Sequence, residues 1–327
     1  MNKSIKIFLK WFLGPLLAVW LFYSLYLQVK HQPGLHNAID LIRSAPFGKQ
    51  AWKFWLVILM VFINWGIESA KWQQLVKSIQ PMSFFTAFRS VLCGVTLSIH
   101  TPNRMGEYAG RVLFVEEGKR LQAVSLSIAG SMSQLIITML LGCGGLLYLV
   151  TSQGTGSVVL GLSVFWMKVF FFGSMMGTLA FLLFFFRMSW LVRLVERLPY
   201  AQRFSKYISV LETFDAKVLL RLLFLSALRY LVFVLQYIFM LQLMQVEQDP
   251  WKAFWLVTVL FWVLAIIPSI AIAELGIRGT VANVLFAYSA NTIGVLAVTF
   301  GIWFVNLFIP ALAGSLLILG IKIKKDK

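Results

Sequence analysis

The sequence predicts an all-α polytopic membrane protein, with about six full transmembrane helices and two re-entrant, broken-helix hairpins arranged as an inverted pseudo-repeat. Of its 327 residues, 60% are hydrophobic and only 13% are charged, which is about half the charged share of a soluble domain. Two polar motifs, Thr101–Arg111 and Pro268–Arg278, interrupt the apolar runs about half a chain apart. An arrangement with eight or more full spans remains an alternative.

The full spans are predicted from apolar runs that are long enough to cross a bilayer. They cover approximately residues 7–29, 52–68, 121–150, 158–186, 218–244 and 292–321. The first is interpreted as a retained helix, because it lacks a small-residue cleavage site. Leu35, Ile39 and Ile42 share one helical face in the linker that follows, which indicates a short interfacial helix. The aromatic and charged residues 64–72 are interpreted as an interfacial belt rather than a site.

The basic residues indicate a membrane orientation rather than nucleic acid binding. The formal net charge is +17, but Lys and Arg cluster at the ends of the apolar runs, as the positive-inside rule expects. Residues 71–89, 116–120 and 187–221 and both termini hold most of them. These segments are therefore predicted to be cytoplasmic, where they would contact anionic lipid. The chain is accordingly expected to be a multi-pass protein of the cytoplasmic (inner) membrane.

Each polar motif is predicted to turn the chain back at a proline, after the apolar arms Phe84–His100 and Trp251–Ile267. If both turn back, the basic segments share one side, the first hairpin enters from the cytoplasm and the second enters from outside. Broken helices at membrane depth need a protein-lined or wet cavity, and paired hairpins build the binding sites of many transporters. The chain is predicted to be one domain, 1–327, with pseudo-repeat halves of about 52–186 and 187–321.

The motifs share a glutamate followed four residues later by an arginine, Glu107–Arg111 and Glu274–Arg278. This spacing allows each pair to neutralise itself on one helical face. Arg104 adds a positive charge to the first motif, and arginine binds phosphate oxygens in a bidentate manner. The motifs therefore predict a site for a phosphate-bearing headgroup. Amide donors at the starts of the half-helices would assist, and a glutamate would be left for a cationic group or a proton.

Three further residues are candidates for the same site. Asn103 lies within the first motif, and His100 stands just before the break, where it is either a proton carrier or a helix cap. Arg229 lies in the middle of an apolar run, so it must face the protein interior or a cavity. A functional role and a structural ion pair are both open for it. The two cysteines and three histidines show no metal-ligand spacing, so neither a metal nor another cofactor is predicted.

The pattern Pro102-x-Arg104-x-Gly106-Glu107-x-x-x-Arg111 resembles the signature of the lysylphosphatidylglycerol synthase transmembrane region, a flippase-like family of polytopic membrane proteins. The second motif resembles the same family. In its two-domain members a flippase domain precedes a cytoplasmic aminoacyl-transferase, and this sequence shows no such transferase region. The resemblance therefore implies lipid translocation rather than an enzyme, with a membrane phospholipid or a polyprenyl-linked lipid headgroup as the cargo.

The leading hypothesis is a translocase that moves an anionic or zwitterionic, phosphate-bearing lipid by alternating access. In it, Arg104, Arg111 and Arg278 hold the headgroup, while Glu107 and Glu274 adjust the charge or couple protons. Two alternatives are an integral-membrane enzyme acting on a lipid phosphate or glycan, and a non-transporting scaffold for lipid synthesis. Against the enzyme, the sequence offers no histidine–carboxylate cluster and no nucleophile–base set.

Overall fold

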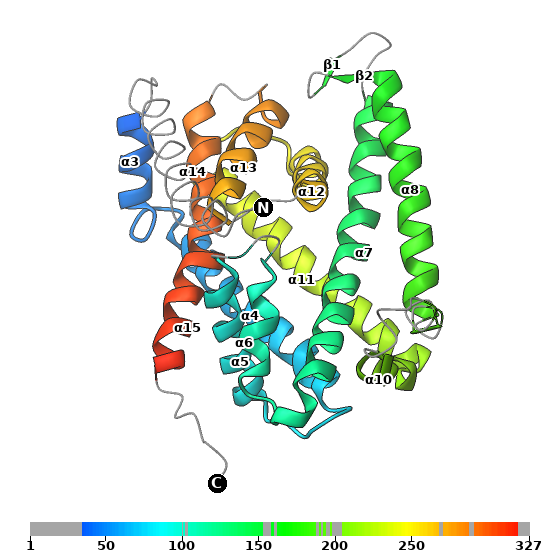
Figure 1. Cartoon of the computed structure of the whole chain (residues 1–327). Helices are drawn as coiled ribbons and strands as arrows, with labels where there is room; N and C mark the ends of the chain where they lie inside the picture. The colour runs from blue at the N-terminus through cyan, green and yellow to red at the C-terminus, as the bar shows by residue number, and fades with distance from the viewer. Residues whose placement is uncertain are drawn as a thin grey trace, which may run out of the picture.

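A computed structural model describes residues 35–99, 101, 104–152, 158–159, 162–187, 190, 192–193, 197, 205–267, 271–287 and 291–319. Within these ranges the protein is built almost entirely of helices (Figure 1). The exception is an antiparallel pair of two-residue strands, β1 (Val158–Val159) and β2 (Leu162–Ser163). The predicted all-α fold is confirmed.

Five of the described helical segments are long and apolar enough to cross a membrane, and they match five of the predicted spans. The other predicted span, residues 7–29, lies outside the described residues. The predicted short helix in the linker is α3 (Leu35–Ser44). The spans are α4 (Ala51–Val76), α7 (Arg120–Ser152, preceded by the short η3, Glu117–Lys119), α8 (Val164–Phe186), α11 (Ala216–Leu243), and α14 (Thr292–Trp303) continued through the π-helical turn η6 (Phe304–Phe308) into α15 (Ile309–Leu319).

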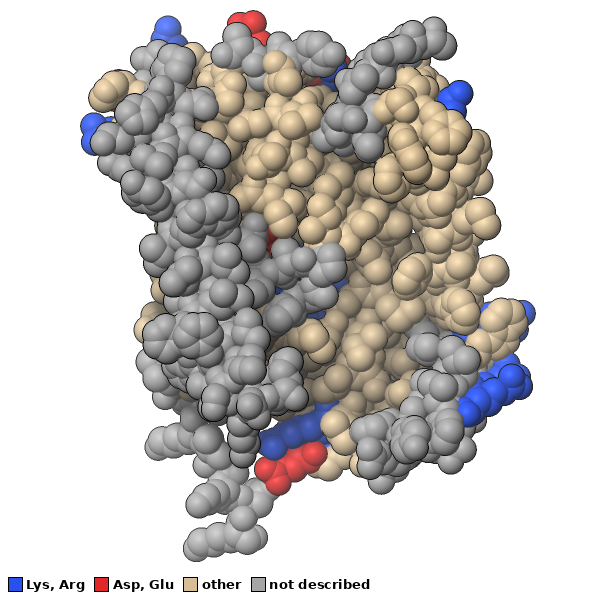
Figure 2. All heavy atoms as spheres, turned by 45° about the horizontal axis from the view of Figure 1, so that its top comes forward, with Lys and Arg blue, Asp and Glu red and all other residues tan. Residues whose placement is uncertain are grey.

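The outer surface has the character of a lipid-facing one. α8 packs mainly on α7, and most of its large apolar side chains, including Phe165, Phe172 and Leu183, are exposed. Figure 2 shows a broad belt of uncharged residues between Lys and Arg side chains gathered towards the two ends of the molecule. Exposed apolar helices flanked by basic residues are typical of a multi-pass membrane protein.

The first polar motif turns the chain back, as predicted. α5 (Phe84–Ser98) is followed by α6 (Gly106–Val112), which runs antiparallel to it. The Ser90 hydroxyl on α5 donates to the backbone carbonyl of Arg111 on α6, at 3.2 Å. α5 and α6 form the first hairpin.

The first hairpin leaves the molecule at the end where it enters. Gln80, which precedes α5, donates from its side-chain amide to the carbonyl of Phe114 at 3.1 Å. Its side-chain oxygen accepts from the amide of Glu116 at 3.1 Å. Both partners follow α6, so one side chain joins the entry and the exit of the hairpin. This supports a re-entrant segment over a full crossing.

A glycine contact allows the two arms of the first hairpin to pack closely. A Cβ added to Gly110 would overlap backbone atoms of Gly94. We expect Gly110→Ala to destabilise the protein by about 1–3 kcal/mol, the usual cost of overpacking, and to lower its melting temperature in detergent. Gly173→Ala on α8 is the matched control, because a Cβ there meets nothing within 4 Å. Equal melting temperatures for the two variants would contradict this account.

α12 (Pro250–Ile266) and α13 (Ala271–Leu285) form the second hairpin, and residues 268–270 at its break lie outside the described ranges. Asn291, after α13, donates from its side-chain amide to the carbonyl of Met244, before α12, at 2.8 Å. The second hairpin therefore also leaves at the end where it enters.

The two hairpins enter from opposite ends of α11. Pro81 and Met82, before the first hairpin, line a cavity together with Thr213 and Phe214, which precede α11. Met244, beside the second hairpin, directly follows the last residue of α11. Figure 1 accordingly shows α5 and α6 in the lower half of the molecule and α12 and α13 in the upper half. Insertion from opposite ends was predicted, and it brings the two broken tips to the middle. The two halves of the pseudo-repeat stay a prediction.

α15 supports the first hairpin from the other side. The Thr96 hydroxyl on α5 donates to the carbonyl of Ala311 on α15, at 2.7 Å. On α14, before the π-helical turn, Thr299 shares a hydrogen bond of 2.8 Å with Tyr237 of α11. The span α14–α15 thus contacts the central helix α11 with its first part and the first hairpin with its second.

Candidate functional site

An ion pair joins the tips of the two hairpins. Arg104 Nη2 lies 3.1 Å from both carboxylate oxygens of Glu274, although the two residues are 170 positions apart in the sequence. Glu274 also pairs with Arg278, one turn further along α13. Arg104 has a φ of 57°, a left-handed conformation that is uncommon for residues other than glycine. The predicted meeting of the two motifs is confirmed.

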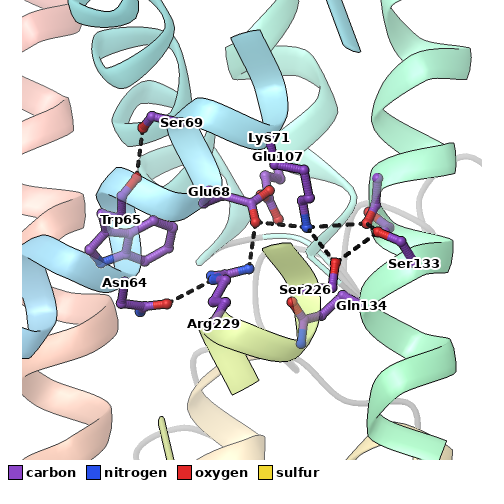
Figure 3. Close-up of polar contacts among 12 residues, drawn as sticks. Asn64, Trp65, Glu68, Ser69, Lys71, Glu107, Ser133, Gln134, Ser226 and Arg229 are labelled. Atoms are coloured by element: carbon purple, nitrogen blue, oxygen red, sulfur yellow. Dashed lines mark hydrogen bonds and ion pairs between the residues drawn. The ribbon is translucent and has the colours of Figure 1, made fainter. Parts of the chain in front are cut away.

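A second ionic cluster surrounds Glu68 on α4 (Figure 3). Its carboxylate oxygens lie 2.9 Å from Lys71 Nζ, 2.7 Å from Arg111 Nη2 and 2.8 Å from Arg229 Nη1. Arg111 also pairs with Glu107, one turn earlier on α6. Glu68, Lys71 and Arg111 are almost completely buried. One carboxylate therefore draws together α4, the first hairpin and α11.

The sequence-based interpretation of residues 64–72 as an interfacial belt was wrong. α4 continues to Val76, and Asn64, Glu68 and Lys71 are buried along it rather than placed at an aqueous surface. The spacing of four and then three residues puts these side chains on one helical face. That spacing inside an apolar run was the signal that could have identified them. Lys71 was also predicted to be one of the cytoplasmic basic residues, and this was wrong, because its side chain is buried.

Lys71 has several polar contacts inside the bundle. Besides Glu68, its Nζ lies 3.3 Å from the carbonyl of Gly130 and 3.4 Å from the Ser226 hydroxyl. The Ser226 hydroxyl in turn lies 2.9 Å from that of Ser133 on α7. Figure 3 shows these groups converging from α4, α7 and α11. Because its donors are used in this way, Lys71 holds the bundle together rather than presenting a free charge.

Amide side chains extend the cluster toward α14–α15. Arg229 Nε donates to Asn64 Oδ1 at 2.8 Å, and Asn64 Nδ2 donates to Asn306 Oδ1 at 3.3 Å. Asn306 Nδ2 donates to Gln236 Oε1 at 3.1 Å. Asn306 therefore links α4 and α11 to the last span. Arg229 makes a structural ion pair with Glu68, and it also lines the cavities described next.

Two adjoining cavities lie beside the hairpin tips. The first, of about 400 Å³, is the larger of these two and is called the larger cavity from here on. It is lined by the charged residues Arg104, Arg229, Glu274 and Arg278 together with aromatic side chains. The second, of about 280 Å³, is lined by Glu68 and others. Arg104 and Arg229 line both cavities, so the two are contiguous. Three arginines and one glutamate give the first cavity an excess of positive charge, which suits an anionic group.

The structure brings together most of the predicted site residues. His100 and Asn103 lie outside the described residues. Arg111 lies near the tips but lines neither cavity, and its guanidinium forms ion pairs with Glu68 and Glu107. Of the predicted site residues, those that line the cavities are Arg104, Glu107, Arg229, Glu274 and Arg278.

Two details of the predicted site are corrected. The first amide of α6 is not left for an anion, because the Gly106 N–H donates to Thr101 Oγ1 at 2.7 Å. Nor is a glutamate left for a cationic group. Glu107 pairs with Arg111, and Glu274 pairs with both Arg104 and Arg278. Ionic contacts within the protein therefore already occupy the carboxylates of both motifs.

A model of the family described as the lysylphosphatidylglycerol synthase TM region matches residues 11–317. The match includes both hairpins and nearly all of every described span. No curated protein and no solved structure matches the chain.

Proposed function

The chain belongs to the lysylphosphatidylglycerol synthase transmembrane-region family of multi-pass membrane proteins, and on this premise we propose that it translocates a phosphate-bearing lipid headgroup across the membrane. The observation that carries the proposal is the meeting of two charged hairpin tips beside contiguous cavities in the middle of the molecule. Charged side chains at membrane depth are costly, and they mark binding sites and transport pathways when they face a cavity.

The chemistry of the larger cavity supports an anionic or zwitterionic phospholipid or polyprenyl-linked lipid as the cargo. Arg104, Arg229 and Arg278 offer guanidinium donors to it, and guanidinium groups match the geometry of phosphate oxygens. Phe233 and Phe261 line the same cavity and supply an apolar wall. We propose that the headgroup occupies this cavity while the lipid chains stay in the bilayer.

The two hairpins suggest how access alternates between the two sides. The first hairpin reaches the site from one end of the molecule and the second hairpin reaches it from the other. The ion pair between Arg104 and Glu274 joins them. We propose that this contact is present when the tips are together and breaks when one hairpin moves to admit a headgroup. Rocking of two inverted elements about a central site is an established mode of transport. The proposal assigns translocation and no chemical reaction.

We propose that the open end of the first hairpin faces the cytoplasm. Exposed basic side chains gather there, including Lys77 and Arg221, which line the cavity beside Pro81. An excess of basic residues on one side marks the cytoplasmic face of an inner-membrane protein, where anionic lipids would contact them. Both chain termini would lie on this side.

Reconstitution into liposomes tests the proposed function. Phospholipids with a fluorescent label on one acyl chain, which leaves the headgroup unmodified, are placed in both leaflets, and dithionite added outside bleaches the outer leaflet only. We expect vesicles containing the purified protein to lose their protected fluorescence faster than protein-free vesicles. If phosphatidic acid, phosphatidylglycerol and phosphatidylethanolamine all cross no faster than in protein-free vesicles, the translocase is excluded.

A further inference from the structure

We infer that the larger cavity selects a headgroup whose phosphate carries two negative charges, such as a phosphate monoester or a pyrophosphate, over zwitterionic and aminoacylated headgroups. This inference rests on the proposed function and specifies its cargo. It is carried by the charges, the donors and the carboxylates of the described residues around the hairpin tips.

The charges around the tips do not balance. In the described core, three carboxylates face five cations, and the set is Glu68, Glu107, Glu274, Lys71, Arg104, Arg111, Arg229 and Arg278. An uncompensated charge at membrane depth is unfavourable. A ligand with two negative charges would bring the cluster to neutrality, whereas a zwitterionic headgroup would leave the excess unchanged.

The excess lies at the larger cavity. Lys71 and Arg111 pair with Glu68 and Glu107, Arg229 shares Glu68 with them, and neither Lys71 nor Arg111 lines that cavity. The charged groups that do line it are Arg104, Arg229, Arg278 and Glu274. The two surplus positive charges are therefore at the wall where a headgroup would bind.

Four side chains that line the same cavity each carry a buried donor without a partner. These donors come from side chains that are each at least nine-tenths buried, and none has a hydrogen-bond partner among the described residues. The atoms are Trp65 Nε1, Tyr230 Oη, Arg278 Nε and Trp303 Nε1. Leaving a buried donor unpaired is costly. Phosphate oxygens are strong acceptors and would satisfy such donors, whereas an ammonium group would bring only more donors.

Among the described residues, the site offers no spare carboxylate for a cationic headgroup. Glu274, the one carboxylate among the described residues that line the larger cavity, already contacts two arginines, and Glu68 contacts three cations. An aminoacyl or ethanolamine group would have to break one of these buried pairs to find a counter-charge. This cost disfavours headgroups that carry an amine.

Lipid binding by the purified full-length protein tests the inference. Native mass spectrometry would compare phosphatidic acid, phosphatidylglycerol and phosphatidylethanolamine with identical acyl chains near pH 8. A phosphate monoester there carries two charges, because its second ionisation lies at about pH 6. We expect phosphatidic acid to bind roughly tenfold or more tightly than the other two, as one added charge-assisted contact implies. This preference should shrink near pH 5. Equal binding of the three lipids near pH 8 would overturn the inference.

Two variants distinguish the effect of the positive charge on lipid binding from the effect of losing the ion pair between the hairpin tips. Arg104→Gln and Glu274→Gln both break the same ion pair, but the first lowers the positive excess and the second raises it. We expect Arg104→Gln to weaken binding of phosphatidic acid about tenfold, and Glu274→Gln to keep or strengthen it. An equal loss in both variants would show that only the ion pair matters, and would overturn the inference.

Two further measurements distinguish a failure of the charge selection from a failure of the proposed translocation. Inorganic phosphate in excess should not displace phosphatidic acid, and full displacement would mean that the site takes a free anion rather than a lipid. In the liposome assay, equal transport of all three lipids would sustain the translocase and overturn the charge selection. If none of them moves, the proposed function fails, and the inference about its cargo fails with it.

Discussion

Glu68→Gln is expected to destabilise the protein by about 3–5 kcal/mol, the cost of removing one partner from a buried ion pair. The neutral amide would leave Lys71, Arg111 and Arg229 without the carboxylate that they share. Because these cations come from three separate structural elements, the loss should loosen the contact of α4 with the first hairpin and with α11. The melting temperature in detergent, followed by fluorescence-detected size-exclusion chromatography, measures the effect.

Glu117→Gln is the control, because it makes the same chemical change at a surface ion pair. The Glu117 side chain is 75% exposed and lies 3.2 Å from Arg120, and such pairs contribute about 0–1 kcal/mol. If Glu68→Gln yields no folded protein, Glu68→Asp retains the charge and should recover part of the yield. Equal melting temperatures for the two glutamine variants would mean that Glu68 does not organise the bundle.

Arg104→Ala is expected to slow lipid translocation by roughly tenfold or more, the loss that one charge-assisted contact produces. The substitution removes the ion pair between the hairpin tips and one of the guanidinium groups that line both cavities. Its effect on stability should be small, because the Arg104 side chain is 41% exposed. The liposome assay and the melting temperature, measured on the same preparation, distinguish loss of transport from loss of folding.

Arg120→Ala provides a matched control for Arg104→Ala. The Arg120 side chain is 45% exposed and forms a surface ion pair with Glu117, away from both cavities. Its removal should leave the translocation rate unchanged. If Arg104→Ala transports as fast as Arg120→Ala at equal amounts of reconstituted protein, the tip contact has no role in transport.

The spans and hairpins were predictable because their signals are local. An apolar run of sufficient length identifies a span wherever the rest of the chain lies. The repeated order of proline, glutamate and arginine identified both breaks, and the i, i+4 spacing predicted the pairs Glu107–Arg111 and Glu274–Arg278. The charge distribution then predicted that the hairpins enter from opposite ends.

The partners of Glu68 were not predictable in the same way. In the sequence, Glu68 and Lys71 stand beside aromatic residues at the end of an apolar run, a composition shared by interfacial belts. Only packing against α6 and α11 shows that this part of α4 is interior. The pairing of Arg104 with Glu274 could be proposed from the repeat, but not its geometry, because no local rule fixes contacts between residues so distant in the chain.

The π-helical turn in the last span determines which face of α15 is turned toward the first hairpin. A π turn holds one residue more than an α-helical turn, and each residue advances a helix by about 100°. The face of α15 that meets Thr96 on α5 is therefore rotated by that angle from the position that an uninterrupted α14 would give it. Deleting one residue within Phe304–Phe308 would leave a span of nearly the same length and hydropathy. Because the π turn already absorbs one extra residue, the shortened turn would be α-helical and α15 would keep the face that meets the first hairpin. Insertion of one further residue there would instead rotate α15 by about 100° and turn a different set of side chains toward the first hairpin.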